Sequence, residues 1–198
     1  MPTWRDLLLA ATALSLAGCA DLIGVEPLAG SDGGSSAISD AEAGLAEDGC
    51  VITWVDSGGG VPPPSGAVPY SVAGSGAVLY VCRVSIPTLG VIPGKLLPGW
   101  ACYYSNGQME VTASNYEVLV PDRCTLAWGP AALGDLPVDA LVCGEDGDGG
   151  SLYSCRVGTT GANPGELGHV GWSTGHECLY SLDGASLVAT DFDVLTAD

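Results

Sequence analysis

The sequence predicts an all-β fold of antiparallel strands, built as two tandem, pseudo-twofold repeats that share one core. Short runs of β-branched and aromatic residues alternate with turns rich in Gly, Pro and Asn. No segment after residue 49 shows a helical period of apolar residues. A set of sequence landmarks also returns in the same order after 71 to 76 residues. Two copies favour a pseudo-twofold pair, because a solenoid needs more units to bury its faces.

Residues 1–18 precede the repeats and have the pattern of a secretory signal peptide. Arg5 is followed by an apolar run over 7–16, which is too short to span a bilayer. The run ends in Leu-Ala-Gly-Cys at 16–19, which resembles the lipobox of bacterial lipoproteins. We therefore expect cleavage before Cys19 and a diacylglycerol on its sulfur. The alternative is a plain secretory signal with an incidental cysteine, although no better cleavage site follows.

Residues 19–48 are rich in Gly, Ser, Ala, Asp and Glu and contain no Lys or Arg. Such a composition buries too little apolar surface to fold, which predicts a tether with a reach of roughly 30 Å. Several acyl chains on Cys19 would anchor the protein almost permanently. We expect an exported, lipid-anchored protein at the bacterial outer membrane, on its periplasmic or surface face, with no other membrane contact.

The first repeat is assigned to residues 49–123. Strands are predicted over 78–84, 100–104 and 116–120, where β-branched and aromatic residues predominate. Asn106-Gly107 is typical of a hairpin turn, and Gly58–Gly60 marks a loop.

The second repeat is assigned to residues 124–198, because it carries the same landmarks in the same order. The segments 50–54, 79–84, 93–95, 102–105 and 116–119 return as 124–128, 152–157, 164–166, 178–181 and 192–195. Matching landmarks predict matching strands in both copies.

Seven cysteines remain once Cys19 is assigned to lipid, and an oxidising compartment makes disulfides the expected state. Six of them form repeat-equivalent pairs: Cys50 with Cys124, Cys82 with Cys155, and Cys102 with Cys178. The simplest symmetric scheme links Cys82 to Cys102 and Cys155 to Cys178 inside the repeats, and Cys50 to Cys124 between them. Cys143 matches Tyr70, so it is either free or takes Cys124. Sequence alone does not fix this connectivity.

Charge and motif content exclude several function classes. The net charge of -18 argues against nucleic acid and anionic lipid headgroups as partners. A zinc site is not expected, because no C-x-x-C spacing occurs and His169 and His176 are the only histidines. Both fall in a segment for which we expect no counterpart in the first repeat. The acidic run 145–150 lacks the ligand set of a calcium-binding EF-hand. With no nucleophile beside a base, we expect neither a cofactor nor an enzyme.

The ordered landmarks resemble DM9 repeats, which also occur at the N-terminus of natterin-like proteins. The landmarks of the first copy are Trp54, Pro62–Pro64, Leu79–Arg83, Pro93–Lys95, Cys102-Tyr103 and Tyr116–Leu119. Those of the second copy are Trp128, 144–149, Leu152–Arg156, Pro164-Gly165, Cys178 and Phe192–Leu195. The resemblance extends from about residue 49 to the end. It implies a β-rich double repeat that binds mannose-type carbohydrate, often as a homodimer.

The resemblance also implies a sugar site made by an acidic residue before Leu-Tyr and the lysine of Pro-Gly-Lys. The first repeat has Lys95 but carries Ala73 in place of the acid, whereas the second keeps Asp146 and has Glu166 where the lysine is expected. Lys95 and Asp146 form one composite site if their loops meet, since ammonium and carboxylate together grip a polyol without a metal. Trp100 or Tyr103 would stack on the sugar ring.

Two alternatives remain open. Lys95 could make a surface ion pair while Asp146 closes a turn, which leaves the sugar site degraded. The protein would then be a non-lectin envelope scaffold or a protein-interaction module. Arg83 and Arg156 occupy equivalent strand positions, and we expect them to form structural ion pairs.

Overall fold

The computed structural model of the protein describes residues 50–197 except 98, 100, 133–134 and 159–162. The predicted signal peptide (1–18), Cys19, the predicted tether (19–48) and Trp100 lie outside the described residues. The described residues form antiparallel strands and one short 3₁₀ turn, η1 (Trp172–Thr174), which confirms the predicted fold class. Among these residues, no helix is long and apolar enough to cross a membrane.

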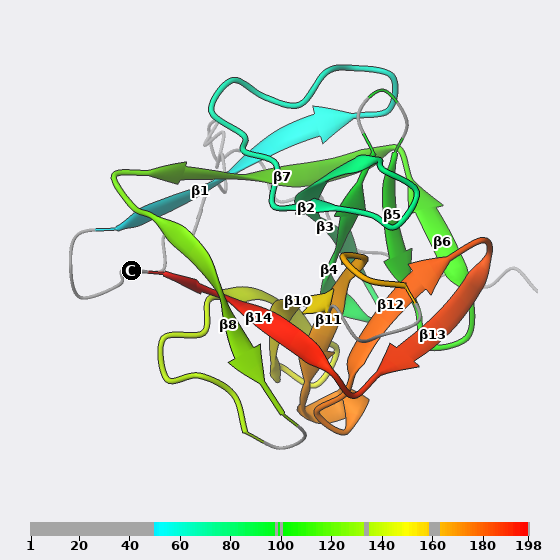
Figure 1. The fold of residues 1–198 in the computed structure, drawn as a ribbon. Helices are drawn as coiled ribbons and strands as arrows, with labels where there is room; N and C mark the ends of the chain where they lie inside the picture. The colour runs from blue at the N-terminus through cyan, green and yellow to red at the C-terminus, as the bar shows by residue number, and fades with distance from the viewer. Residues whose placement is uncertain (1–49, 98, 100, 133–134, 159–162, 198) are drawn as a thin grey trace, which may run out of the picture. The chain divides into compact units, whose positions relative to one another are not determined.

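The strands fall into two consecutive series (Figure 1). The first repeat contains β1 (Val51–Gly58), β2 (Ser71–Val72), β3 (Val78–Ile86), β4 (Gly90–Leu96), β5 (Cys102–Ser105), β6 (Glu110–Ala113) and β7 (Asn115–Asp122). The second contains β8 (Leu126–Ala131), β9 (Val142–Asp146), β10 (Ser151–Val157), β11 (Leu167–Gly171), β12 (Cys178–Leu182), β13 (Ala185–Ala189) and β14 (Phe192–Ala197). The three strands predicted in the first repeat correspond to β3, β5 and β7.

Each strand of the first repeat has a counterpart with the same partners. In the first repeat β7 pairs with β1 and β3, β3 with β2 and β4, and β5 with β4 and β6. In the second, β14 pairs with β8 and β10, β10 with β9 and β11, and β12 with β11 and β13. The duplication seen in the sequence is thus a duplication of strand topology.

The two repeats join through strands and side chains. β4 pairs with β9, which connects both copies into one 14-stranded sheet. At the right of Figure 1 the β5–β6 and β12–β13 hairpins meet, and the amide of Glu110 donates to the Gly184 carbonyl. One buried cluster contains Leu79, Val81 and Leu119 from the first repeat together with residues of the second. The prediction of a shared core is confirmed.

The Asn106-Gly107 turn forms as predicted between β5 and β6. The Asn106 side-chain oxygen accepts hydrogen bonds from the amides of Gln108 and Met109, each at 3.0 Å. Gly107 has φ of 89°, which a residue with a side chain rarely adopts. This turn matters because it borders the pocket described below.

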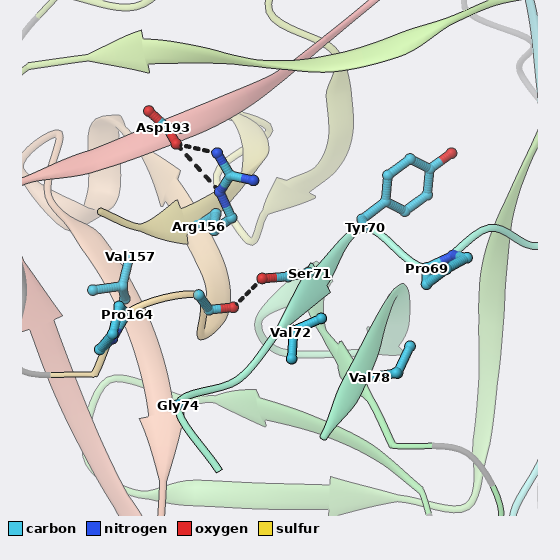
Figure 2. Close-up of a pocket in the computed structure, with 11 residues that line it drawn as sticks. Pro69, Tyr70, Ser71, Val72, Gly74, Val78, Arg156, Val157, Pro164 and Asp193 are labelled. Carbon is cyan, nitrogen blue, oxygen red and sulfur yellow. Dashed lines mark hydrogen bonds and ion pairs between the residues drawn. The ribbon is translucent and has the colours of Figure 1, made fainter. Parts of the chain in front are cut away.

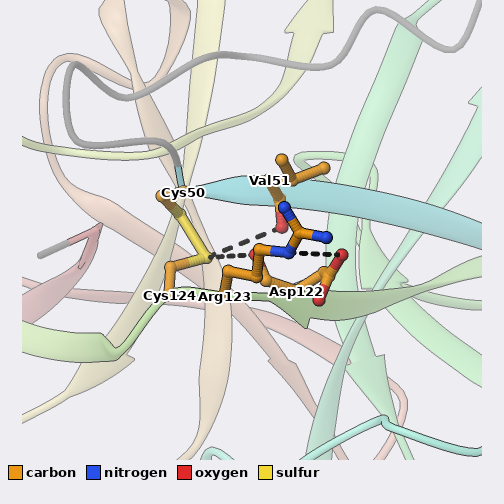
Figure 3. Close-up of a disulfide and its surroundings, with 5 residues drawn as sticks. All are labelled: Cys50, Val51, Asp122, Arg123 and Cys124. Carbon is orange, nitrogen blue, oxygen red and sulfur yellow. Dashed lines mark hydrogen bonds and ion pairs between the residues drawn. A yellow bond between two sulfur atoms is a disulfide. The ribbon is translucent and has the colours of Figure 1, made fainter.

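The disulfides follow the symmetric scheme. Cys82 pairs with Cys102 and Cys155 with Cys178, while Cys50 and Cys124 link the start of the first repeat to the start of the second (Figure 3). Cys143 is a free, buried thiol, and burial raises its pKa to about 11. The alternative in which Cys143 captures Cys124 is therefore wrong.

Each repeat also contains an arginine held between a tryptophan and a carboxylate. The Arg83 Nε lies 2.7 Å from Glu117 Oε2, and its guanidinium lies 4.2 Å from the centre of the Trp54 ring. In the second repeat Arg156 bonds to Asp193 (Figure 2), 4.9 Å above Trp128. The expected structural ion pairs are confirmed, with ring stacking that the sequence did not indicate.

Candidate functional site

Strand register shows which residues of the two repeats correspond. In the first repeat Lys95 on β4 lies opposite Tyr103 on β5. In the second repeat His169 on β11 lies opposite Leu179 on β12. Tyr103 and Leu179 each follow the second cysteine of their intra-repeat disulfide, so they correspond. His169 is therefore the structural counterpart of Lys95.

The glycines before these two residues support the same correspondence. A Cβ atom on Gly94 would lie 2.3 Å from the Tyr103 carbonyl oxygen, and one on Gly168 would lie 2.3 Å from that of Leu179. Both glycines allow the neighbouring strand to approach so closely that no side chain fits between them. The two strand pairs thus share a specific close contact as well as a register.

This register corrects two sequence-based expectations. Pro93-Gly94 lies within β4, whereas Pro164-Gly165 lies in the longer connection before β11. Matching the two Pro-Gly pairs therefore shifts the alignment by three residues, and Glu166 is not the counterpart of Lys95. His169 lies in a strand with a clear counterpart, so the expectation of an unmatched segment is also wrong for this residue.

The first-repeat site surrounds Lys95, which is only 3% exposed. Its Nζ lies 2.6 Å from Glu166 Oε2, donates to the Ser181 carbonyl and lies 3.7 Å from Glu110 Oε1. Glu166 is 4% exposed. An ammonium has three donors, and here it has three acceptors, all from the protein. Lys95 thus forms a buried ion pair, in contrast to the surface pair that one alternative expected.

The turn that should carry the acid of this site has the right shape but lacks the carboxylate. Ala73 and Asp146 occupy equivalent hairpin positions: the amide of Ala73 bonds to the Ala77 carbonyl and that of Asp146 to the Gly150 carbonyl, both at 2.8 Å. Ala73 is buried. The first-repeat site is therefore closed by Lys95 together with Glu166 and the Ser181 carbonyl of the second repeat, and it has no acidic group in its turn.

The region of the second repeat that is equivalent to the Lys95 site contains an unfilled pocket, here called the second-repeat pocket. It has a volume of about 370 Å³. Its lining comes from both repeats: Thr88, Leu89, Ile92, Ser105–Gly107, Asp146–Asp148, Leu152, His169, Ser173, Thr174 and Leu179. Buried Ile92 and Leu152 give it an apolar base, while Asn106, Asp148 and Ser173 are exposed at its edge. An apolar base with a few polar groups around it is typical of a small-molecule site.

Asp146 is held in one orientation at this pocket. Its Oδ1 accepts hydrogen bonds from the amides of Gly150 at 2.7 Å and Asp148 at 3.1 Å. These bonds, with one from the Ser173 hydroxyl, lower the pKa of Asp146, the Gly150 bond having the largest effect. Asp146 therefore closes its own turn, as one alternative expected, and its carboxylate is ionised and pre-oriented at neutral pH.

His169 contributes a buried hydrogen-bond acceptor to the same pocket. The side chain is only 5% exposed, and its Nδ1 has no hydrogen-bond partner. Burial lowers the pKa of His169 to about 4, against the effect of a hydrogen bond to the Pro93 carbonyl. Because Nδ1 has no partner, we assign that bond and the proton of the neutral ring to Nε2, which leaves a lone pair on Nδ1. Buried polar atoms without a partner are rare, and this one belongs to a residue that lines the pocket.

The structure does not bring the two sequence-predicted sugar residues into one pocket. Asp146 lies opposite Gly90 on β4. Lys95 lies five residues further along that strand, at about 16 Å by the rise of a β-strand. Lys95 and Tyr103 do not line the pocket that contains Asp146. Asp146 instead shares its pocket with His169, which no sequence motif indicates as a site residue.

A further pocket of about 620 Å³ lies between β2 and the connection before β11 (Figure 2). Its charged side chains are already paired, since Arg156 bonds to Asp193, and the Ser71 hydroxyl donates to the Gly165 carbonyl. Tyr70 also lines this pocket, and its hydroxyl has no hydrogen-bond partner. Within the described part of the chain, no three His, Cys, Asp or Glu side chains gather in a way that could hold a metal ion. The second-repeat pocket is therefore the better candidate site.

Comparison with known proteins gives one family likeness. A sequence model of the DM9 repeat family matches residues 74–169, slightly less than half of the chain. The match begins in the turn before β3 and ends at His169, so it includes Lys95 and Asp146 as well. A search of curated proteins found no significant match.

Proposed function

We propose that the protein is a carbohydrate-binding module of the mannose-type lectin class, with its binding site in the second-repeat pocket. The observation that carries this proposal is that Asp146 and His169 line one pocket with an apolar base. A pre-oriented carboxylate and the His169 Nδ1 accept hydrogen bonds from sugar hydroxyls, and the apolar base suits the C–H face of a pyranose ring. The DM9 likeness of residues 74–169 supports the same class of ligand.

The setting of the module is also a proposal. We propose that residues 1–18 direct export, that Cys19 carries the lipid anchor and that residues 19–48 tether the module to the bacterial outer membrane. The protein has no catalytic role and needs no cofactor in this proposal. Dimerisation, which the family resemblance implies, would present two pockets per assembly.

An envelope scaffold or protein-interaction module is the second candidate. The observation that favours it is the first-repeat site, where Glu166 forms an ion pair with Lys95, the lysine that a sugar would need. This candidate requires the second-repeat pocket to be unused as well.

A glycan array probed with the purified, oxidised protein distinguishes the two. We expect binding to mannose-type glycans that a chelator does not affect and that Asp146→Asn abolishes. Asp183→Asn is a matched control, because it makes the same charge change in the β12–β13 turn, outside the pocket. A blank array from folded protein would contradict the lectin proposal and favour the scaffold.

A further inference from the structure

The second-repeat pocket offers acceptors but no positive charge. The carboxylate of Asp146 and the unpartnered Nδ1 of His169 are acceptors, and no Lys or Arg lines the pocket. Asp148 adds a second carboxylate at its edge. The equivalent strand position in the first repeat holds Lys95, so the change from Lys to His removes a cation from this place.

No other cation of the described chain is available to replace it. Lys95 is bound to Glu166, and Arg83 and Arg156 are bound to Glu117 and Asp193. The exposed Arg123 lies beside Asp122. With a net charge of -18, the surroundings add to the negative potential at the pocket.

We infer that this pocket prefers sugars that carry a protonated amino group over neutral and acidic sugars. The inference rests on the proposed function and names the ligand class for the same site. The ligand's ammonium supplies the charge that Lys95 would supply in the first repeat. It donates to the Asp146 carboxylate, and hydrogen bonds with ionised partners are stronger than neutral ones. A ligand carboxylate would meet Asp146 and Asp148 without any cation to offset them.

The test is isothermal titration calorimetry of the purified, oxidised protein with matched sugars at pH 6. The probes are mannosamine, N-acetylmannosamine and mannose, the corresponding glucose series, and glucuronate. A sugar amine is protonated at this pH, as an α-amino group with a pKa of about 7.7 would be. We expect the free amino sugars to bind about tenfold more tightly than their N-acetyl and parent forms, as one charge-assisted hydrogen bond would provide.

Two further measurements trace the preference to Asp146. Raising the salt concentration should shrink the advantage of the amino sugars, because it screens charge and leaves neutral binding in place. Asp146→Asn should remove the advantage, while Asp183→Asn should keep it. The salt series uses the unaltered protein, so it stands even if a variant fails to fold.

Equal or tighter binding of the N-acetyl, parent or acidic sugars would overturn this inference and leave the proposed function standing. A preference for the amine that neither salt nor Asp146→Asn changes would also overturn it. If none of the sugars binds, both the inference and the proposed function fail.

Discussion

Lys95 and His169 occupy equivalent strand positions, but their neighbours differ in one decisive residue. Glu166, one residue before β11, corresponds to Ile92 on β4, because Arg83 lies opposite Pro93 and Arg156 opposite Leu167. In the first repeat the lysine binds a carboxylate, whereas in the second the histidine shares its pocket with an isoleucine. The two sites therefore differ at two positions: Lys95 against His169, and Glu166 against Ile92. These two differences leave the first-repeat site sealed and the second-repeat pocket open.

The Lys95–Glu166 pair should behave as a buried ion pair. Lys95→Ala leaves the Glu166 carboxylate buried without its cation, and we expect a loss of about 3–5 kcal/mol in the free energy of unfolding. The double variant Lys95→Met, Glu166→Leu removes both charges and should recover most of that loss. Urea unfolding with intact disulfides measures both. A loss below about 1 kcal/mol for Lys95→Ala would show that the pair is solvated.

His169 should make stability depend on pH. Its pKa of about 4 in the folded protein lies below the reference value of 6.5, so between these values the unfolded state binds the proton and the folded state does not. Stability is therefore complete above about pH 6.5 and falls by up to about 3 kcal/mol as the pH drops to 4.

Unfolding curves of His169→Leu against pH test this effect. The variant should lose the part of the pH dependence between pH 6.5 and 4 that the wild type shows, while His176→Asn should retain it. The difference between variant and wild type is the relevant quantity, because carboxylates also titrate near the lower end of this range. Parallel curves for His169→Leu and the wild type would contradict a buried, neutral imidazole.

At the scale of elements, the sequence predicted where strands form better than it predicted which strand residues of the two repeats correspond. Alternating β-branched and aromatic residues indicated β3 and β7, and Asn106-Gly107 indicated the hairpin between β5 and β6. The register of β11 could not be read from Pro-Gly, because that dipeptide also occurs in connections. A better signal was present in Gly94-Lys95-Leu96 and Gly168-His169-Val170, where glycine and an aliphatic residue flank the site position.

The two in-register glycines should be intolerant of a side chain. Gly168→Ala places a methyl group against the Leu179 carbonyl, so β11 and β12 must separate at the strand that carries His169. We expect a loss of about 1–3 kcal/mol, typical of overpacking. Thermal unfolding measures it, with Gly74→Ala as the control, since nothing lies nearer than 3.9 Å to that Cβ position. Similar values for both variants would argue against the close contact.

At the scale of the whole folded unit, the Cys50–Cys124 bridge links the starts of the two repeats. It spans 74 residues, so Cys50→Ser with Cys124→Ser should cost about 4 kcal/mol through the entropy of the unfolded chain. The double variant also avoids a stray thiol. Denaturant unfolding measures the loss. A change of less than about 1 kcal/mol would show that β4–β9 pairing and the shared core alone hold the repeats together.

Duplication made the fold predictable from the sequence, but not the site. Repeated cysteines made the symmetric disulfide scheme the simplest one, and the structure decides between it and a Cys143–Cys124 pair. Equivalent arginines pointed to the two ion pairs. The two sites differ because Glu166 of the second repeat binds Lys95 of the first, whereas Ile92 of the first repeat only lines the pocket that contains His169. No local sequence pattern around Lys95 reveals that its ammonium is bound by Glu166 and the Ser181 carbonyl of the second repeat. The result is one open pocket per chain where the sequence suggested a site divided between the copies.

The most direct test of this account is an amide NMR titration of the protein with mannose and with glucosamine. The account predicts chemical-shift changes in the Asp146–Gly150 turn, at Asn106-Gly107 and at Ser173-Thr174, with none at Lys95, Glu166 or Ser181. Shift changes centred on Lys95 with the Asp146 turn unaffected would contradict it, because they would place the sugar in the site that the structure shows as sealed.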